Sequence, residues 1–165
     1  MAQTKLGEHV VNTVGELPSV GSTAPDFVLT GSDMKEVTLS QFAGKNLVLN
    51  IFPSVDTGVC SASVREFNKR AASLTNTSVL CVSKDLPFAM KRFCAAEGIS
   101  NVVTATDFRN RGFATRYGVE LTNGGFAGLC ARAVVVIDST GKVKYTELVP
   151  QIGQEPNYDA ALAVL

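Results

Sequence analysis

The strongest pattern of hydrophobic positions is a mainly apolar run over residues 47–52, followed by apolar residues at helical spacing. The run predicts a buried strand, and Pro53 ends it because proline has no backbone N–H to donate to the ladder. A helix after this strand is predicted by residues at intervals of three or four: Val64, Phe67, Ala71 and Leu74. Asp56 or Thr57 suits its N-cap, and we expect the helix to run to about residue 76.

A second strand and a second helix follow the first pair. Residues 78–83 predict another buried strand, so the first helix would join two parallel strands through a right-handed crossover. Asp85 is the expected cap of the next helix, with Pro87 in its first turn and Gly98 at its end. Cys94 is therefore expected late on this second helix.

Shorter patterns complete the predicted fold. Residues 1–24 suggest a β-hairpin that covers one end of the sheet, and residues 131–138 and 143–148 predict an antiparallel hairpin. The other expected elements are extended segments at 25–30 and 36–39, an edge strand at 101–105, and helices at 109–117 and after residue 156. Together these predict one domain, residues 1–165, of the α/β class, with a central mixed sheet flanked by helices.

Composition argues against several classes of function. Fifteen basic and fifteen acidic residues leave no net charge, which argues against nucleic acid as a partner. The first twenty residues have no apolar signal-peptide core, and no apolar span is long enough for a membrane, so we expect a cytoplasmic protein. The chain has one histidine, His9, and no Cys-x-x-Cys pair or glycine-rich phosphate loop. We therefore expect neither a metal nor a nucleotide cofactor.

The most reactive position in this pattern is Cys60, in or beside the first turn of the helix after residue 57. A helix N-terminus favours an anion, so the thiolate is stabilised there, typically by about 0.3–1 kcal/mol. Keeping a cysteine largely ionised at neutral pH takes roughly 3.4 kcal/mol. A second positive group is therefore needed, and a buried arginine, which stays charged and offers five donors, suits the task.

The motif Pro53-x-x-x-Thr57-x-x-Cys60 resembles the active-site motif of the peroxiredoxins. The stretch around it is similar to the bacterial thiol peroxidases, a branch of atypical 2-Cys peroxiredoxins. Further segments of the chain resemble the same family: Gln41-Phe42-Ala43-Gly44-Lys45, Asp85-Leu86-Pro87-Phe88-Ala89, Arg92-Phe93-Cys94 and residues 131–138. The resemblance implies a thioredoxin-like fold and hydroperoxide reduction. It also implies recycling by thioredoxin and a homodimer.

The resemblance also implies a role for each matching residue. Cys60 is the peroxidatic cysteine and Arg132 the activating cation, and the ring of Pro53 shields the thiolate from water. We expect the Thr57 hydroxyl to contact the thiolate and position the peroxide, beyond any contribution as a helix cap. A surface arginine would be the ordinary interpretation of Arg132 without the family match.

Cys94 is implied as the resolving cysteine, which forms an intramolecular disulfide with Cys60. Spacing alone would equally allow a half-buried structural cysteine. Cysteines on separate packed helices usually exceed the Cα separation of about 7 Å that a disulfide permits, so one or both helix ends must unwind. Cys81 and Cys130 are interpreted as non-catalytic. If Cys94 is not the resolving cysteine, Cys130 is the better alternative, because it is close to Arg132 in sequence.

The predicted function is therefore a thiol-dependent peroxidase that reduces hydrogen peroxide and organic hydroperoxides. Apolar residues such as Phe52, Val55 and Phe126 would suit either a substrate pocket or the core. Two alternatives remain: a general thiol–disulfide oxidoreductase, and a non-catalytic redox sensor or interaction domain. The absence of Cys-x-x-Cys weakens the first, and turnover of peroxide would exclude the second.

Overall fold

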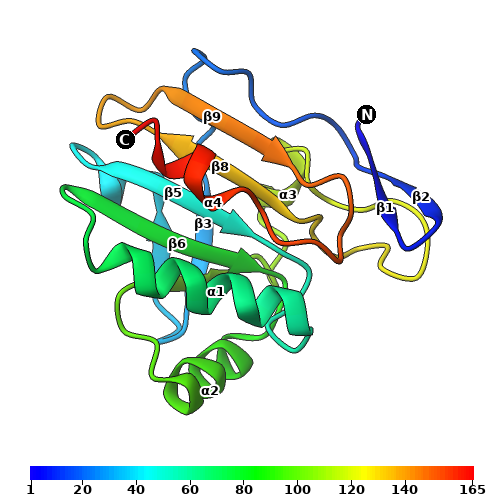
Figure 1. The fold of residues 1–165 in the computed structure, drawn as a ribbon, viewed down its shortest axis with the longest axis horizontal. Helices are drawn as coiled ribbons and strands as arrows, with labels where there is room; N and C mark the ends of the chain where they lie inside the picture. Colours follow the sequence, from blue (N-terminus) through cyan, green and yellow to red (C-terminus); the bar gives the residue numbers. More distant parts are fainter.

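The computed structural model describes residues 1–165, which form a seven-stranded mixed sheet and a separate two-stranded hairpin (Figure 1). The strand order is β4-β3-β7-β6-β5-β8-β9. Its strands are β3 (Val28–Gly31), β4 (Glu36–Thr38), β5 (Asn46–Ile51), β6 (Thr77–Ser83), β7 (Val103–Thr106), β8 (Ala133–Ile137) and β9 (Val143–Leu148). The mixed sheet flanked by helices is confirmed.

The parallel unit at the centre of the sheet is also confirmed. β5 and β6 pair in parallel, and α1 (Gly58–Ala71) connects them. The helix ends before residue 76 because the N–H groups of Ser73 and Leu74 bond only three residues back and Asn76 adopts a left-handed φ of 48°. Leu74 still packs against the core below the helix, which explains why the apolar pattern extends past the helix end.

Side chains of the central strands alternate between two apolar cores, as the period of a strand requires. One face packs against α1, α2 (Pro87–Glu97) and α4 (Tyr158–Leu162), with α1 and α2 side by side below the sheet in Figure 1. The other face packs against α3 (Phe113–Arg116) and the 3-10 turn η1 (Leu39–Phe42). Cys60 belongs to the first core and Cys130 to the second.

Three local predictions were wrong. The segment at 101–105 is β7, an interior strand between β3 and β6, because the β3–β4 hairpin adds to it; local sequence carries no sign of that pairing. The helix at 109–117 shrinks to α3, because Asn110 and Gly112 take left-handed φ values of 57° and 96°. Asp85 does not cap α2: Leu86 holds the N-cap position, without a side-chain hydrogen bond.

The predicted N-terminal hairpin is formed by β1 (Gln3–Leu6) and β2 (His9–Asn12). It lies beyond the carboxyl ends of β5 and β6 in Figure 1. Thr4 Oγ1 donates to the Val149 carbonyl at 2.7 Å, and the Ile152 N–H donates to the Lys5 carbonyl at 2.9 Å. The hairpin therefore fixes the position of the segment around Ile152. None of the helices combines the length and apolar character that a membrane crossing requires.

Candidate active site

Cys60 is the third residue of α1, which follows β5 through the loop at 52–57. Its side chain is fully buried, and its carbonyl oxygen accepts a hydrogen bond from Ser63 Oγ at 2.7 Å. Cys60 thus lies in the first turn of the helix, as predicted from the sequence. The N-terminal end of a helix carries a partial positive charge.

Arg132 supplies the positive charge. Its Nη2 donates to Cys60 Sγ at 3.1 Å, and its Nε donates to the Ile152 carbonyl at 2.7 Å. Ala133 pairs with Ile51 in antiparallel register, so Arg132 lies beside the end of β5, where α1 begins. Because residues alternate along β8, the Arg132 side chain points to the same face of the sheet as α1. The side chain is only 1% exposed, so this contact is made away from bulk water.

One nitrogen of the Arg132 guanidinium, Nη1, is buried and has no hydrogen-bond partner. Buried donors are nearly always paired, since an unpaired one costs roughly 1–3 kcal/mol. A donor left free beside the Cys60 sulfur is therefore suited to an acceptor that the substrate brings. An oxygen atom of a peroxide fits that description.

Thr57 occupies the N-cap position of α1, but its side chain makes no capping bond. The hydroxyl instead donates to the Ser54 carbonyl at 3.0 Å, and no hydrogen bond joins it to Cys60. The expected contact with the sulfur is thus absent in this arrangement, although the lone pairs of the oxygen stay available to an incoming donor. Pro53 is buried just beyond the end of β5.

A cleft of about 170 Å³ opens next to this group of residues. Its walls come from the N-terminal hairpin, the start of α1 and two loops: Leu6, Thr57, Gly58, Val59, Phe126, Arg132, Ile152 and Gly153. Arg132 joins the cleft to the Cys60 sulfur that lies behind it. Of the three apolar residues considered for a pocket from sequence, Phe126 lines the cleft, whereas Phe52 and Val55 belong to the core.

Cys94 lies in the last part of α2, half-buried, with its sulfur 4.0 Å from Thr104 Oγ1. Burial raises the pKa of its thiol above the ordinary value, with a smaller opposing effect from Thr104. All four cysteines are free, and the sulfur atoms of Cys60 and Cys94 have different partners. The structure thus presents the reduced arrangement of the chain.

The other two cysteines are fully buried, and burial outweighs the opposing effects of an Asn50 hydrogen bond on Cys81 and of the Lys84 charge on Cys130. Burial raises the pKa of Cys81 to about 12 and that of Cys130 to about 12, so both remain thiols at neutral pH. Cys81 shares the core that contains Cys60, whereas Cys130 lies in the core on the opposite face of the sheet. Cys81 therefore lies on the same face of the sheet as Cys60, and Cys130 lies on the other face.

Sequence reasoning missed two supporting residues. Ile152 offers the carbonyl that orients Arg132, and nothing in the sequence signals a backbone acceptor so far along the chain. Asp85 accepts hydrogen bonds from the loop before α1 instead of capping α2. No group of three or more His, Cys, Asp or Glu side chains is placed to hold a metal ion.

The chain is similar to known proteins over its full length. The family model described as Redoxin matches residues 19–162. The thiol peroxidase of Mycobacterium tuberculosis (strain ATCC 25618 / H37Rv) is 60% identical over 165 residues, covering 100% of this chain and 99% of the relative. The thiol peroxidase of Mycobacterium bovis shows the same identity and coverage.

Solved structures with the same fold include a peroxiredoxin-like protein and a thiol peroxidase. A peroxiredoxin-like protein from Aquifex aeolicus superposes with a TM-score of 0.93 at 40% identity, covering 99% of this chain and 95% of that one. A thiol peroxidase from Chromobacterium violaceum reaches a TM-score of 0.91 at 22% identity, with the same coverage, and supports the fold alone. The thioredoxin-like peroxiredoxin fold is confirmed, and the chain belongs to the Redoxin family, in the thiol peroxidase branch of the peroxiredoxins.

Proposed function

We propose that this chain is a thiol peroxidase that reduces hydrogen peroxide and organic hydroperoxides through Cys60. The observation that carries the proposal is the buried contact of 3.1 Å between Arg132 Nη2 and Cys60 Sγ at the start of α1. The Cys60 thiolate attacks the outer oxygen of the peroxide, the O–O bond breaks, and the alcohol or water leaves after taking a proton. Cys60 is left as a sulfenic acid.

In this step the free Nη1 of Arg132 donates a hydrogen bond to the leaving oxygen of the peroxide. Negative charge develops on the leaving oxygen as the O–O bond breaks, and a preorganised donor in a dry site stabilises it far better than water would. The hydroxyl of Thr57 lines the same cleft and accepts a hydrogen bond from the peroxide, which orients it for in-line attack. Both groups are present before substrate arrives.

The cleft favours organic hydroperoxides, because Leu6 and Phe126 form apolar walls next to Arg132. Phe126→Ala is expected to lower kcat/KM for cumene hydroperoxide about tenfold, the scale of one lost apolar contact in a pocket. Hydrogen peroxide, which has no organic group, should lose less than twofold. Steady-state kinetics with both substrates measure this directly, and equal losses for the two would contradict a substrate-binding role for the cleft.

We further propose that Cys94 resolves the sulfenic acid. The thiol of Cys94 condenses with the Cys60 sulfenic acid, forming the disulfide and releasing one water molecule. Because packed helix axes lie about 8–10 Å apart and both cysteines are on helices, part of α1 or α2 must unwind first. Leaving the core would also free the Cys94 thiol from the burial that keeps it protonated. Thioredoxin, as the dithiol reductant, then restores both thiols by exchange.

Cys94→Ser is expected to react with one equivalent of peroxide as fast as the unchanged protein, yet to lose turnover with thioredoxin about 100-fold or more. Peptide mapping by mass spectrometry should find Cys60 joined to Cys94 in the unchanged protein and a sulfenic acid in the variant. Cys130→Ala is the matched control, since Cys130 lies on the other face of the sheet. A peptide joining Cys60 to Cys81 would refute the assignment.

The same experiment separates the alternatives. A general thiol–disulfide oxidoreductase would exchange with disulfide substrates but consume little peroxide, and a redox sensor would be oxidised once without turnover. The homodimer that the resemblance implies and the cytoplasmic location expected from the sequence stay predictions.

A further inference from the structure

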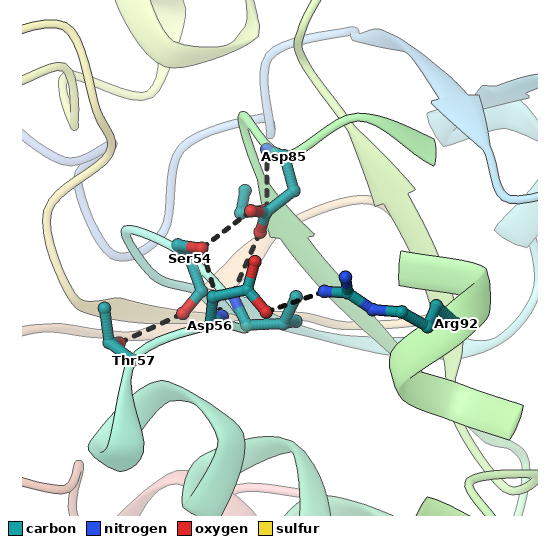
Figure 2. Close-up of polar contacts among 7 residues, drawn as sticks. Ser54, Asp56, Thr57, Asp85 and Arg92 are labelled. Carbon is teal, nitrogen blue, oxygen red and sulfur yellow. Dashed lines mark hydrogen bonds and ion pairs between the residues drawn. The ribbon is translucent and has the colours of Figure 1, made fainter. Parts of the chain in front are cut away.

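A group of polar contacts holds the loop between β5 and α1 to the segment that leads into α2 (Figure 2). Asp85 Oδ1 accepts from Ser54 Oγ at 2.7 Å, and Asp85 Oδ2 accepts from the Val55 N–H at 2.9 Å. The same Oδ2 also accepts from Ser83 Oγ, at the end of β6. One carboxylate therefore joins the end of β6 to the loop that precedes the peroxidatic helix.

A second contact joins this loop to α2 itself. Arg92 Nη2 donates to Asp56 Oδ1 at 2.8 Å, and Figure 2 shows the guanidinium reaching from α2 to the loop. Arg92 lies two residues before Cys94, and Asp56 lies directly before the N-cap Thr57. This pair thus connects the segments that carry the two redox cysteines. We call Asp85 with its partners, together with the Asp56–Arg92 pair, the clasp.

The clasp has opposite consequences for the two steps of the reaction. It fixes Ser54, whose carbonyl accepts from the Thr57 hydroxyl, so it holds Thr57 and the start of α1 in the position that meets peroxide. Disulfide formation instead requires that α1 or α2 unwinds. Movement of the loop breaks the Asp85 contacts, and movement of either segment breaks the Asp56–Arg92 pair.

We infer that Asp85 and the Asp56–Arg92 pair are positioning residues that favour reaction with peroxide and delay the approach of Cys94. This inference rests on the proposed function. While the clasp is closed, the sulfenic acid persists, and a second peroxide can oxidise it: Cys60–SOH and ROOH give Cys60–SO₂H and ROH. The clasp therefore sets the division of the sulfenic acid between disulfide and irreversible sulfinic acid.

The expected effects differ in size because the contacts differ in exposure. The side chains of Arg92 and Asp56 are 66% and 62% exposed, so Arg92→Gln should accelerate disulfide formation only about two- to fivefold, the range for one exposed ion pair. Asp85→Asn replaces an acceptor oxygen with a donor NH₂ group. It should accelerate disulfide formation about tenfold and slow the first oxidation of Cys60, since hydrogen bonds to a charged group are stronger.

The test is rapid-quench mass spectrometry of the full chain, which counts sulfenic acid, disulfide and sulfinic acid at Cys60 over a range of peroxide concentrations. Both variants should form less sulfinic acid per turnover than the unchanged protein. A double-mutant cycle is completed by Asp56→Asn, Arg92→Gln and the variant with both changes. The double variant should lower the yield of sulfinic acid no more than either single variant does. Arg111→Gln, which breaks an exposed pair with Glu36 at another edge of the sheet, is the matched control.

Failure of the inference is distinct from failure of the proposed function. If the unchanged protein joins Cys60 to Cys94 but neither Arg92→Gln nor Asp85→Asn alters the yield of sulfinic acid, the clasp has no such role. If no Cys60–Cys94 disulfide forms in the unchanged protein, both the resolving assignment and the clasp are overturned. A fall in melting temperature without a change in that yield would also count against the inference.

Discussion

Cys60→Ser is expected to abolish peroxide reduction, with a loss of activity on the order of 10⁴-fold or more. A serine hydroxyl in this position stays protonated because no general base lies beside it; the neighbouring group is the Arg132 guanidinium, which cannot accept a proton. The oxidation of thioredoxin by peroxide, followed through a coupled reductase, measures the loss.

The control for this substitution is another buried cysteine. Cys130→Ala also removes a fully buried thiol, so its cost in stability is comparable, but its sulfur lies in the opposite core. It should retain nearly all activity. Substantial turnover by Cys60→Ser, or an equal loss in Cys130→Ala, would mean that the reactive sulfur has been assigned to the wrong residue.

The sequence was sufficient to predict the parts of the fold that depend on local patterns. The run at 47–52 and the helical spacing after it predict β5 and α1, and the proline and helix start place Cys60 in the first turn. The N-terminal hairpin and the final antiparallel strands follow from alternation and turn residues. In each case the deciding information lies within about twenty residues.

The parts that failed depend on partners far away in the chain. Asp85 has the spacing of a helix cap, yet its carboxylate is taken by Ser54 and Val55, some thirty residues earlier. β7 becomes an interior strand only because β3 pairs with it. Sequence patterns describe local preference, and such long-range pairings override it.

The candidate site shows the same division. Cys60 could be argued from its place at a helix start, whereas Arg132 and Cys94 were assigned only through the resemblance. The structure supports the assignment of Arg132 independently of the resemblance, because β5 and β8 pair in a register that puts Arg132 beside α1. The proposed role of Cys94 requires α1 or α2 to unwind before the two sulfur atoms can meet.

Arg132→Lys is the second large effect that we expect, a loss of about 100-fold or more in kcat/KM although the charge is kept. Arg132 uses Nε for the Ile152 carbonyl and Nη2 for Cys60, and it keeps Nη1 free. A lysine has one nitrogen at the end of a flexible stem and cannot fill these positions together. The loss is of the size seen when one preorganised donor is removed from an active site.

Two measurements separate this from a simple loss of stability. Leaving the Ile152 carbonyl unpaired should cost about 1–3 kcal/mol in the free energy of unfolding, which urea denaturation detects. The rate at which iodoacetamide alkylates Cys60 near neutral pH reports the thiolate directly, and it should fall in the folded variant. If alkylation and peroxide turnover both stay near normal, the positive charge alone suffices and the forked geometry of the guanidinium is not what activates the sulfur.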